Sequence, residues 1–164
     1  GLLWIRGQSN DYDNWQQQGN KGWGWDDVLP YFLKSENNEL GPSKFHNDKG
    51  PITVTNKKIN LKMLEEFQNA AEEMGIPKIN DFNTGDNFGC DYFQVTEKNG
   101  LRCSTAVAYL NPAKKRSNLK VDVKAHVKQI NFEGNKAVGV SYWKNGTLIN
   151  VNAVSYTHLR AHET

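Results

Sequence analysis

Long apolar runs, a large net charge and cysteines are what this sequence of 164 residues has little of. No apolar run approaches the roughly 18 residues that a membrane-spanning helix needs, and the N-terminus lacks the basic and apolar regions of a signal peptide. The net charge of +2 is too small to indicate nucleic acid as a partner. We therefore expect a cytoplasmic protein, at most peripheral to a membrane, that binds no nucleic acid.

Cysteine is too scarce for a disulfide-stabilised fold or a thiolate metal site. The two cysteines, Cys90 and Cys103, do not form a C-x-x-C pair, and we expect both thiols to be reduced. His158 and His162 stand four residues apart, as two metal ligands on one helix face would, but no third ligand occurs at a suitable spacing. The sequence therefore predicts no metal site.

A complete set of residues for nucleophilic catalysis is also missing. No G-x-S-x-G motif occurs, and the arginine before Cys103 is only a weak sign of a reactive thiol. His46 and His126 are isolated in the sequence, which is more typical of surface histidines, or of histidines with satisfied hydrogen bonds, than of catalysts. We therefore assign no catalytic residue to this chain.

A glycine-rich stretch, GNKGWGW at residues 19–25, is a candidate phosphate-binding loop. Its glycines follow the order G-x-x-G-x-G, the reverse of the G-x-G-x-x-G dinucleotide fingerprint, and no apolar strand precedes them. Trp23 and Trp25 would also crowd a phosphate, which needs bare backbone. We expect this loop to turn the chain and lead into a helix rather than to bind phosphate.

Tryptophans near the N-terminus allow two interpretations. Stacked indoles could form the platform of a non-catalytic carbohydrate-binding module, or they could pack into a core around the first helix. A binding module should expose coplanar indoles on one strand face, whereas an enzyme fragment should bury Trp23 and Trp25 against the helix that follows. The tryptophans concerned are Trp4, Trp15, Trp23 and Trp25.

Hydrophobic periodicity predicts an α+β chain large enough to bury a core. The predicted helices cover residues 26–36, 61–74 and 104–115, and short strands are expected at 51–55 and 90–96. From residue 118 the pattern predicts an antiparallel β-meander, with strands at 119–123, 126–132, 137–143 and 148–151. The Asn145-Gly146 pair is a strong signal for a type I′ hairpin turn in this region.

The ends of two helices can be predicted more closely. The first should be capped by Asp26 or Asp27, with Pro30 in its first turn, where a missing N–H costs little. The second should begin after Asn60 and end at Gly75. Its apolar residues recur at three- and four-residue steps and so fall on one face; they are Leu61, Leu64, Phe67, Ala71 and Met74.

Six blocks of the sequence, in their order, resemble one enzyme family. They are LLWIRGQSNDYDNW, GNKGWGWDDVLPYFLKSE, FHNDKGPITV, GIPKINDFN, YFQVTEKNGLRCSTAVAYLNPAKKRSNLKV and AHVKQINFEGNKAVGV. With these blocks the chain is similar, over about residues 1–153, to the glucose–methanol–choline (GMC) oxidoreductases, flavoenzymes of alcohol oxidation. The wording is nearest to the branch of choline dehydrogenases and related alcohol dehydrogenases.

The resemblance implies FAD as the cofactor and a small-molecule alcohol as the substrate, with hydride transfer to the flavin. It implies a central fragment of an FAD-binding Rossmann-like domain, with part of the substrate domain. The family's dinucleotide loop would precede Gly1 and its catalytic histidine would follow the chain; His158 and His162 do not match that histidine. We therefore expect a dehydrogenase or oxidase in full length, and an inactive chain in isolation.

Few residue roles carry over through this resemblance. Gly1 and Leu2 match the end of the loop that approaches the flavin, and Val127 matches the valine whose backbone meets the adenine. These three are the predicted cofactor-binding residues. Arg6 and residues 11–15 match the segment that forms the flavin lid.

Two residues of the NGLRCS block are expected to be structural. Arg102 should anchor a loop, and Ser104 should cap the helix that follows it. After residue 153 the sequence departs from the family's pattern, and VSYTHLRAHET resembles translated vector or adapter sequence. We expect residues 1–153 to be a partial N-terminal, FAD-binding region of the family and residues 154–164 to be a non-native tail.

Overall fold

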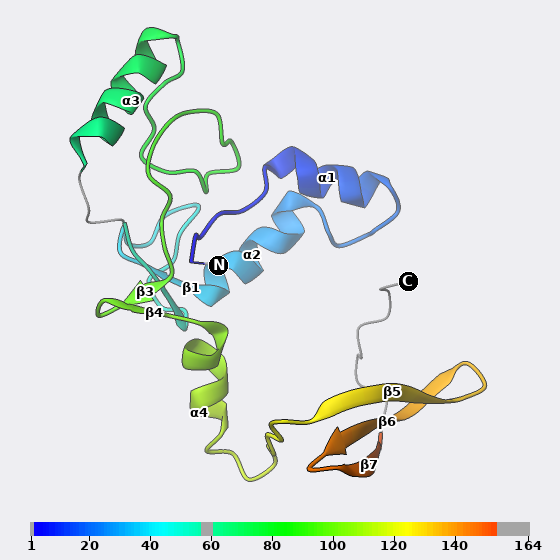
Figure 1. Ribbon diagram of the computed structural model, residues 1–164. Helices are drawn as coiled ribbons and strands as arrows, with labels where there is room; N and C mark the ends of the chain where they lie inside the picture. The colour runs from blue at the N-terminus through cyan, green and yellow to red at the C-terminus, as the bar shows by residue number, and fades with distance from the viewer. Residues whose placement is uncertain (1, 57–60, 154–164) are drawn as a thin grey trace. The chain divides into compact units, whose positions relative to one another are not determined.

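The computed structural model describes residues 2–56 and 61–153 and divides the chain into two compact units, 1–116 and 117–164 (Figure 1). Both helices and strands are present, as the predicted α+β class requires. Three of the predicted features lie outside the described residues: the cofactor contact Gly1, the cap Asn60 and the tail 154–164. In the described part of the chain no helix is long and apolar enough to cross a membrane.

The first unit begins with two packed helices, α1 (Ser9–Gln17) and α2 (Trp25–Ser35). The prediction for the start of α2 is wrong, because its N-cap is Gly24 and not Asp26 or Asp27. The Asp13 carboxylate, from α1, accepts the Trp25 N–H at 2.9 Å and so satisfies a donor at the helix start. Pro30 consequently lies inside the helix rather than in its first turn.

Two short parallel strands follow, β1 (Glu36–Asn38) and β2 (Ile52–Val54). The β2 strand was predicted, but β1 was not, because its sequence ENN has low β propensity. Both strands alternate between buried and half-buried residues. In β1 the buried side chains are Glu36 and Asn38, so a polar strand forms here through tertiary hydrogen bonds rather than through local preference.

Helix α3 (Lys62–Glu73) ends as predicted. Gly75 has φ of +85°, its N–H donates to the Glu72 carbonyl at 2.9 Å, and the Ile76 N–H donates to the Ala71 carbonyl at 2.9 Å. These bonds form a Schellman motif. The apolar face of α3 is only partly buried: Ala71 is buried and Leu64 half-buried, whereas three members are exposed, namely Leu61, Phe67 and Met74.

Residues 90–96 form isolated bridges rather than the predicted strand. The strands of this region are β3 (Glu97–Lys98) and β4 (Leu101–Arg102), an antiparallel hairpin that turns at Asn99-Gly100. A helical stretch follows, made of the π-helical η1 (Ala106–Leu110) and α4 (Asn111–Ala113). Ser104 caps it as predicted, since its Oγ accepts the Val107 N–H at 3.3 Å.

The second unit is a three-stranded antiparallel sheet of β5 (His126–Glu133), β6 (Lys136–Lys144) and β7 (Thr147–Asn152). The turn at Asn145-Gly146 has positive φ at both residues, 49° and 79°, as its sequence predicts. The strand expected at 119–123 does not form. Asp122 instead accepts a hydrogen bond from the Tyr142 hydroxyl at 2.8 Å and pairs with Lys144.

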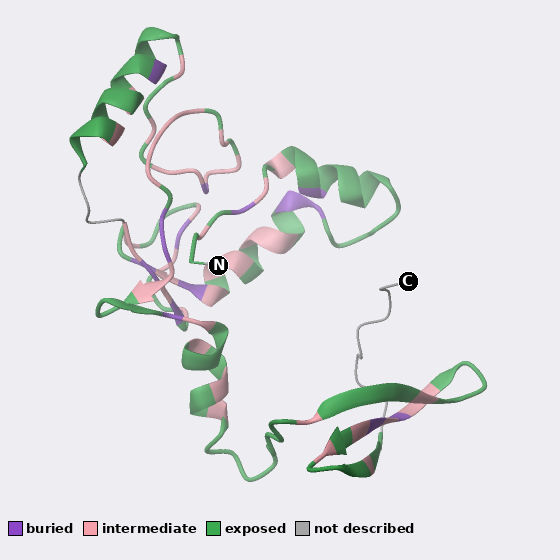
Figure 2. Ribbon diagram, in the orientation of Figure 1, coloured by how far each residue is buried: buried purple, intermediate pink, exposed green. Residues whose placement is uncertain are grey.

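Buried side chains of the first unit are polar almost as often as they are apolar. Figure 2 shows the buried stretches along the N-terminal segment, at the start of α2 and around β1 and β2, while α3 is mostly exposed. The buried apolar residues are Tyr12, Trp25, Ile52, Val54, Ala71, Val95 and Cys103; the buried polar residues of this unit are Arg6, Glu36, Asn38, His46, Asn83 and Gln94. A charged network therefore forms part of the core.

Candidate functional site

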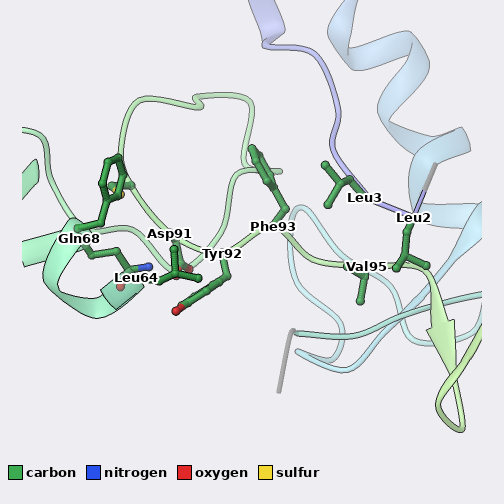
Figure 3. A pocket seen from close by; sticks show the side chains of 10 residues that line it. Leu2, Leu3, Leu64, Gln68, Asp91, Tyr92, Phe93 and Val95 are labelled. Carbon is green, nitrogen blue, oxygen red and sulfur yellow. The ribbon is translucent and has the colours of Figure 1, made fainter. Parts of the chain in front are cut away.

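An apolar pocket of about 360 Å³ opens beside the N-terminal segment (Figure 3). Leu2, Leu3 and Val95 lie at one end, and Leu64 of α3 lies at the other. Asp91 is the one charged side chain in a lining that is otherwise mostly aliphatic and aromatic. Pockets of this size and character hold small molecules in many proteins, so we take this pocket as the candidate site.

The backbone at the Leu2 end of the pocket is held in a fixed place. The Leu2 carbonyl accepts hydrogen bonds from the Thr96 N–H at 2.8 Å and the Thr96 hydroxyl at 3.3 Å. Leu3 forms an antiparallel bridge with Val95, and the Trp4 N–H donates to the Gln94 carbonyl at 2.8 Å. Leu2 and Leu3 nevertheless keep 42% and 58% of their surface exposed, so a fixed backbone presents apolar side chains outward.

Behind this segment, the Glu36 carboxylate is the centre of a buried charged network. Its side chain is completely buried, and its two oxygens have different partners. Oε1 lies 2.7 Å from Arg6 Nη2 and 3.0 Å from His46 Nδ1, while Oε2 accepts the indole N–H of Trp4 at 3.0 Å. One carboxylate therefore binds the side chains of both Trp4 and Arg6.

His46 lies between two carboxylates, since its Nε2 also lies 2.7 Å from Asp81 Oδ2. Burial by itself lowers the pKa of His46, but the hydrogen bonds and charges of Asp81 and Glu36 outweigh burial and raise the pKa to about 9. Burial likewise favours the neutral forms of Glu36 and Asp81, yet His46 and Arg6 hold the pKa of each below its ordinary value. At neutral pH two cations thus face two anions.

The network continues into the backbone of the N-terminal segment. The Arg6 N–H donates to Asn83 Oδ1 at 2.8 Å, and Asn83 Nδ2 donates to the Trp4 carbonyl at 3.2 Å. The Arg6 carbonyl accepts from Asn87 Nδ2 at 3.2 Å, and the guanidinium donates to the Phe45 carbonyl at 2.7 Å. The N–H and carbonyl groups of both residues are therefore bound by segments far away in the sequence.

The predicted cofactor contacts fall in different parts of the chain. Leu2 lies at the pocket in the first unit, and Val127 is an exposed residue of β5 in the second unit. Arg102 is exposed on β4, and its side chain makes no ion pair with another described residue, so the anchoring role predicted for it is not seen. Cys103 beside it is buried, and both cysteines are free thiols.

The tryptophans do not form a carbohydrate platform. Trp25 is buried as predicted, but it begins α2 itself and packs against Tyr12 of α1, with ring centroids 5.6 Å apart, rather than against the helix that follows. Trp23 is 55% exposed, so the predicted burial of this residue is wrong. It meets Trp15 edge to face at an interplanar angle of 65°, and none of the four candidate indoles lies on a strand. A row of coplanar rings is therefore absent among them.

Three residues of the buried network were not recognised from the sequence. His46 was expected to be a surface or a satisfied group, and it is a satisfied, buried one; Glu36 and Asp81 were given no role. Each occurs in a different motif block, and the His46–Asp81 contact spans 35 positions. No spacing rule connects such residues, so only their presence in the resemblance blocks could have indicated them. In the described residues no cluster suitable for a metal ion occurs.

Comparison with known proteins shows which proteins this chain resembles. The sequence model of the family described as GMC oxidoreductase matches residues 1–159. The mitochondrial choline dehydrogenase of Homo sapiens is 39% identical over 145 residues, which are 88% of this chain and 24% of that protein. The oxygen-dependent choline dehydrogenase of Chromohalobacter salexigens is 42% identical over 151 residues, 89% of this chain and 27% of that protein.

Solved structures show the same similarity. Pyridoxine 4-oxidase from Mesorbium loti superposes with a TM-score of 0.86 at 25% identity, over 92% of this chain and 30% of that one. An FAD-dependent oxidoreductase from Chaetomium thermophilum superposes with a TM-score of 0.85 at 28% identity, over 93% and 29%. The chain spans about a quarter of the length of the curated relatives that it matches.

Proposed function

Because the chain belongs to the GMC oxidoreductase family, we propose that it is part of an FAD-dependent oxidoreductase that acts on the CH–OH group of an alcohol. Choline is the first candidate substrate. The observation that carries this proposal is the identity of 39–42% to choline dehydrogenases over nearly nine-tenths of the chain. The bound FAD would accept the hydride that leaves the alcohol carbon.

The Leu2 end of the pocket fits a flavin. A flat, largely apolar ring needs an apolar surface that does not move, and exposed leucine side chains on a hydrogen-bonded backbone supply one. We propose that Leu2, together with Gly1 before it, contacts the flavin ring. These residues would bind and orient the cofactor and exclude water from one side of it.

Val127 fits a different part of the cofactor. It lies on β5, an edge strand of the described sheet, whose outer backbone groups have no strand partner. Unpaired N–H and carbonyl groups of an edge strand can bind the donor and acceptor edge of a base. We propose that the backbone of Val127 meets the adenine of FAD.

For the fold, we propose that this chain is the central piece of a Rossmann-like FAD-binding domain with part of the substrate domain. The three-stranded sheet would be a β-meander within it. The described pocket wall contains no histidine, so this chain would supply walls and scaffold, while proton transfer would fall to residues elsewhere in the full protein. The purified 164-residue chain should therefore show no alcohol oxidation.

The test is an anaerobic titration of the purified full-length protein. It should carry a yellow flavin, and choline should bleach the absorbance of oxidised flavin near 450 nm, as is general for flavin reduction. 3,3-Dimethylbutan-1-ol, an uncharged analogue of the same shape, is the matched control and should react much more slowly if choline is the substrate. A full-length protein without flavin, or flavin that no alcohol reduces, would overturn the proposal.

Two smaller proposals concern the chain's context. We propose that residues 154–164 are not native, because the family wording stops at residue 153; the family match itself reaches residue 159. Sequencing the parent clone across codon 154 decides this point, since a continued family pattern would contradict it. We also propose a cytoplasmic location, at most peripheral to a membrane, which cell fractionation tests.

A further inference from the structure

In the segment Trp4–Arg6, the side chains and the backbone groups of both end residues are bound by other parts of the chain. The Trp4 indole and the Arg6 guanidinium both bind the Glu36 carboxylate. The backbone groups of Trp4 and Arg6 bind Gln94, Asn83 and Asn87. These partners lie 30 to 90 positions away in the sequence. Directly before this segment lie the exposed side chains of Leu2 and Leu3.

We propose that Glu36 is a positioning residue for the cofactor: through Trp4 and Arg6 it fixes Leu2 and Leu3 where they contact the flavin ring. This inference rests on the proposed function for the flavin contact. The coupling between Glu36 and the segment stands on the hydrogen bond from Trp4 and the ion pair with Arg6, without that function.

Glu36 is suited to this role because it reaches both residues at once. Its Oε1 binds the guanidinium of Arg6, and its Oε2 binds the indole of Trp4. Asp81 acts one step further away, through His46 and Asn83. Among the described carboxylates, Glu36 is therefore the one that bonds directly to the segment.

An amide at position 36 removes one of the two contacts to the segment without changing the size of the side chain. Glu36→Gln keeps the shape of the side chain but replaces one acceptor oxygen with an NH₂ group. Either the Trp4 indole or the Arg6 guanidinium then faces a donor, so one of the two links is lost. The segment should loosen while the fold around β1 and β2 is retained.

The first arm of the test measures amide hydrogen exchange in the full-length protein. In Glu36→Gln, the Trp4 and Arg6 amides should exchange at least tenfold faster relative to amides inside α2, which serve as the internal reference. Val54→Ala is the matched control, because Val54 is completely buried in β2 and its carbonyl binds Glu39 rather than the segment. Equal relative exchange in the two variants would overturn the coupling.

The second arm measures the flavin in the full-length holoenzyme at equal FAD occupancy. Glu36→Gln should shift the visible absorption bands of bound FAD and raise its fluorescence at least twofold, and Val54→Ala should leave both unchanged. If the Trp4 amide exchanges faster in Glu36→Gln but the flavin spectrum is unaltered, the proposed role of Glu36 in positioning the flavin would be contradicted. A wild-type holoenzyme that binds no FAD would instead overturn the proposed function, while the exchange result would still decide the coupling.

Discussion

The first unit contains a charged network in its interior, whereas the described ion pair of the second unit lies closer to the surface. In the first unit Arg6, Glu36 and His46 are buried and joined into one network. In the second unit the described ion pair, Asp122 with Lys144, keeps about 30% of each side chain exposed. A buried charge is costly unless it is fully paired, whereas an exposed pair contributes little. The same substitution should therefore have very different consequences in the two units.

Loss of the central carboxylate should have the largest effect. Glu36→Ala leaves the cations of Arg6 and His46 buried without their shared partner, which typically costs about 3–5 kcal/mol. Asp122→Ala, the matched change in the second unit, should cost about 0–1 kcal/mol. Urea denaturation followed by tryptophan fluorescence measures both.

If Glu36→Ala and Asp122→Ala lost similar amounts of unfolding free energy, the expected difference between the two units would be contradicted. If Glu36→Ala does not fold at all, Glu36→Gln replaces it in the comparison. An unfolding free energy of Glu36→Gln within about 1 kcal/mol of the wild type, the size of an exposed pair, would contradict a network in which every bond is needed.

Alkaline pH should weaken the first unit next most strongly. The folded pKa of His46 is raised from 6.5 to about 9, so the stability from its charge is fully present below pH 6.5 and is lost as pH rises through 9. That shift corresponds to about 3 kcal/mol. Since the folded pKa values of Glu36 and Asp81 are lowered, their contributions are present above the ordinary carboxylate pKa and disappear as pH falls.

The measurement is the unfolding free energy at a series of pH values from 4 to 10. Stability should be greatest between the two limits, and His46→Gln should flatten the alkaline limb. His126→Gln, a change at an exposed histidine of the second unit, is the control and should reproduce the wild-type profile. An alkaline limb that persists in His46→Gln would assign the pH dependence to another group.

Alanine substitutions at two glycines, one in each unit, should lower stability by moderate and different amounts. A Cβ on Gly50 would collide with the backbone of Glu36, so Gly50→Ala should cost about 1–3 kcal/mol through forced displacement. A Cβ on Gly146 would meet open space, and only its φ of +79° opposes alanine, at about 1 kcal/mol. Thermal unfolding of both variants tests this, and a larger loss for Gly146→Ala would contradict it.

A small effect is expected from the hydrogen bonds inside the sheet of the second unit. The Ser141 hydroxyl lies 3.0 Å from Asn131 Oδ1 and 2.6 Å from Asn150 Oδ1, and it links the three strands. Ser141→Ala should cost about 1 kcal/mol, with no change in the exchange of Trp4 or Arg6. Thr147→Ala, at an exposed strand position, is the control and should cost less.

Local features of the fold were predictable from the sequence, and non-local ones were not. The end of α3 at Gly75 and the turn at Asn145-Gly146 follow from backbone preferences of a few neighbouring residues. The parallel strand β1 and the Glu36 network depend on partners 10 or more positions away. No periodicity records such pairs, and the sequence ENN even argues against a strand.

The candidate site shows the same division. Leu2 and Arg6 were singled out through the family resemblance, and both lie in the segment beside the pocket. Periodicity identified the apolar face of α3, but it does not report whether another element covers that face. Trp23 was misplaced for the same reason, while Trp25 found a partner in Tyr12 of the adjacent helix.

A double-mutant cycle between Glu36 and His46 tests most directly whether the buried charges act as one unit. The unfolding free energies of Glu36→Gln, His46→Gln and the double variant are compared with that of the wild type at pH 6. We predict that the two losses are non-additive, with a coupling of about 1–3 kcal/mol in favour of the pair. Losses that add to within about 0.5 kcal/mol would contradict the account, because they would show two independent bonds instead of a network.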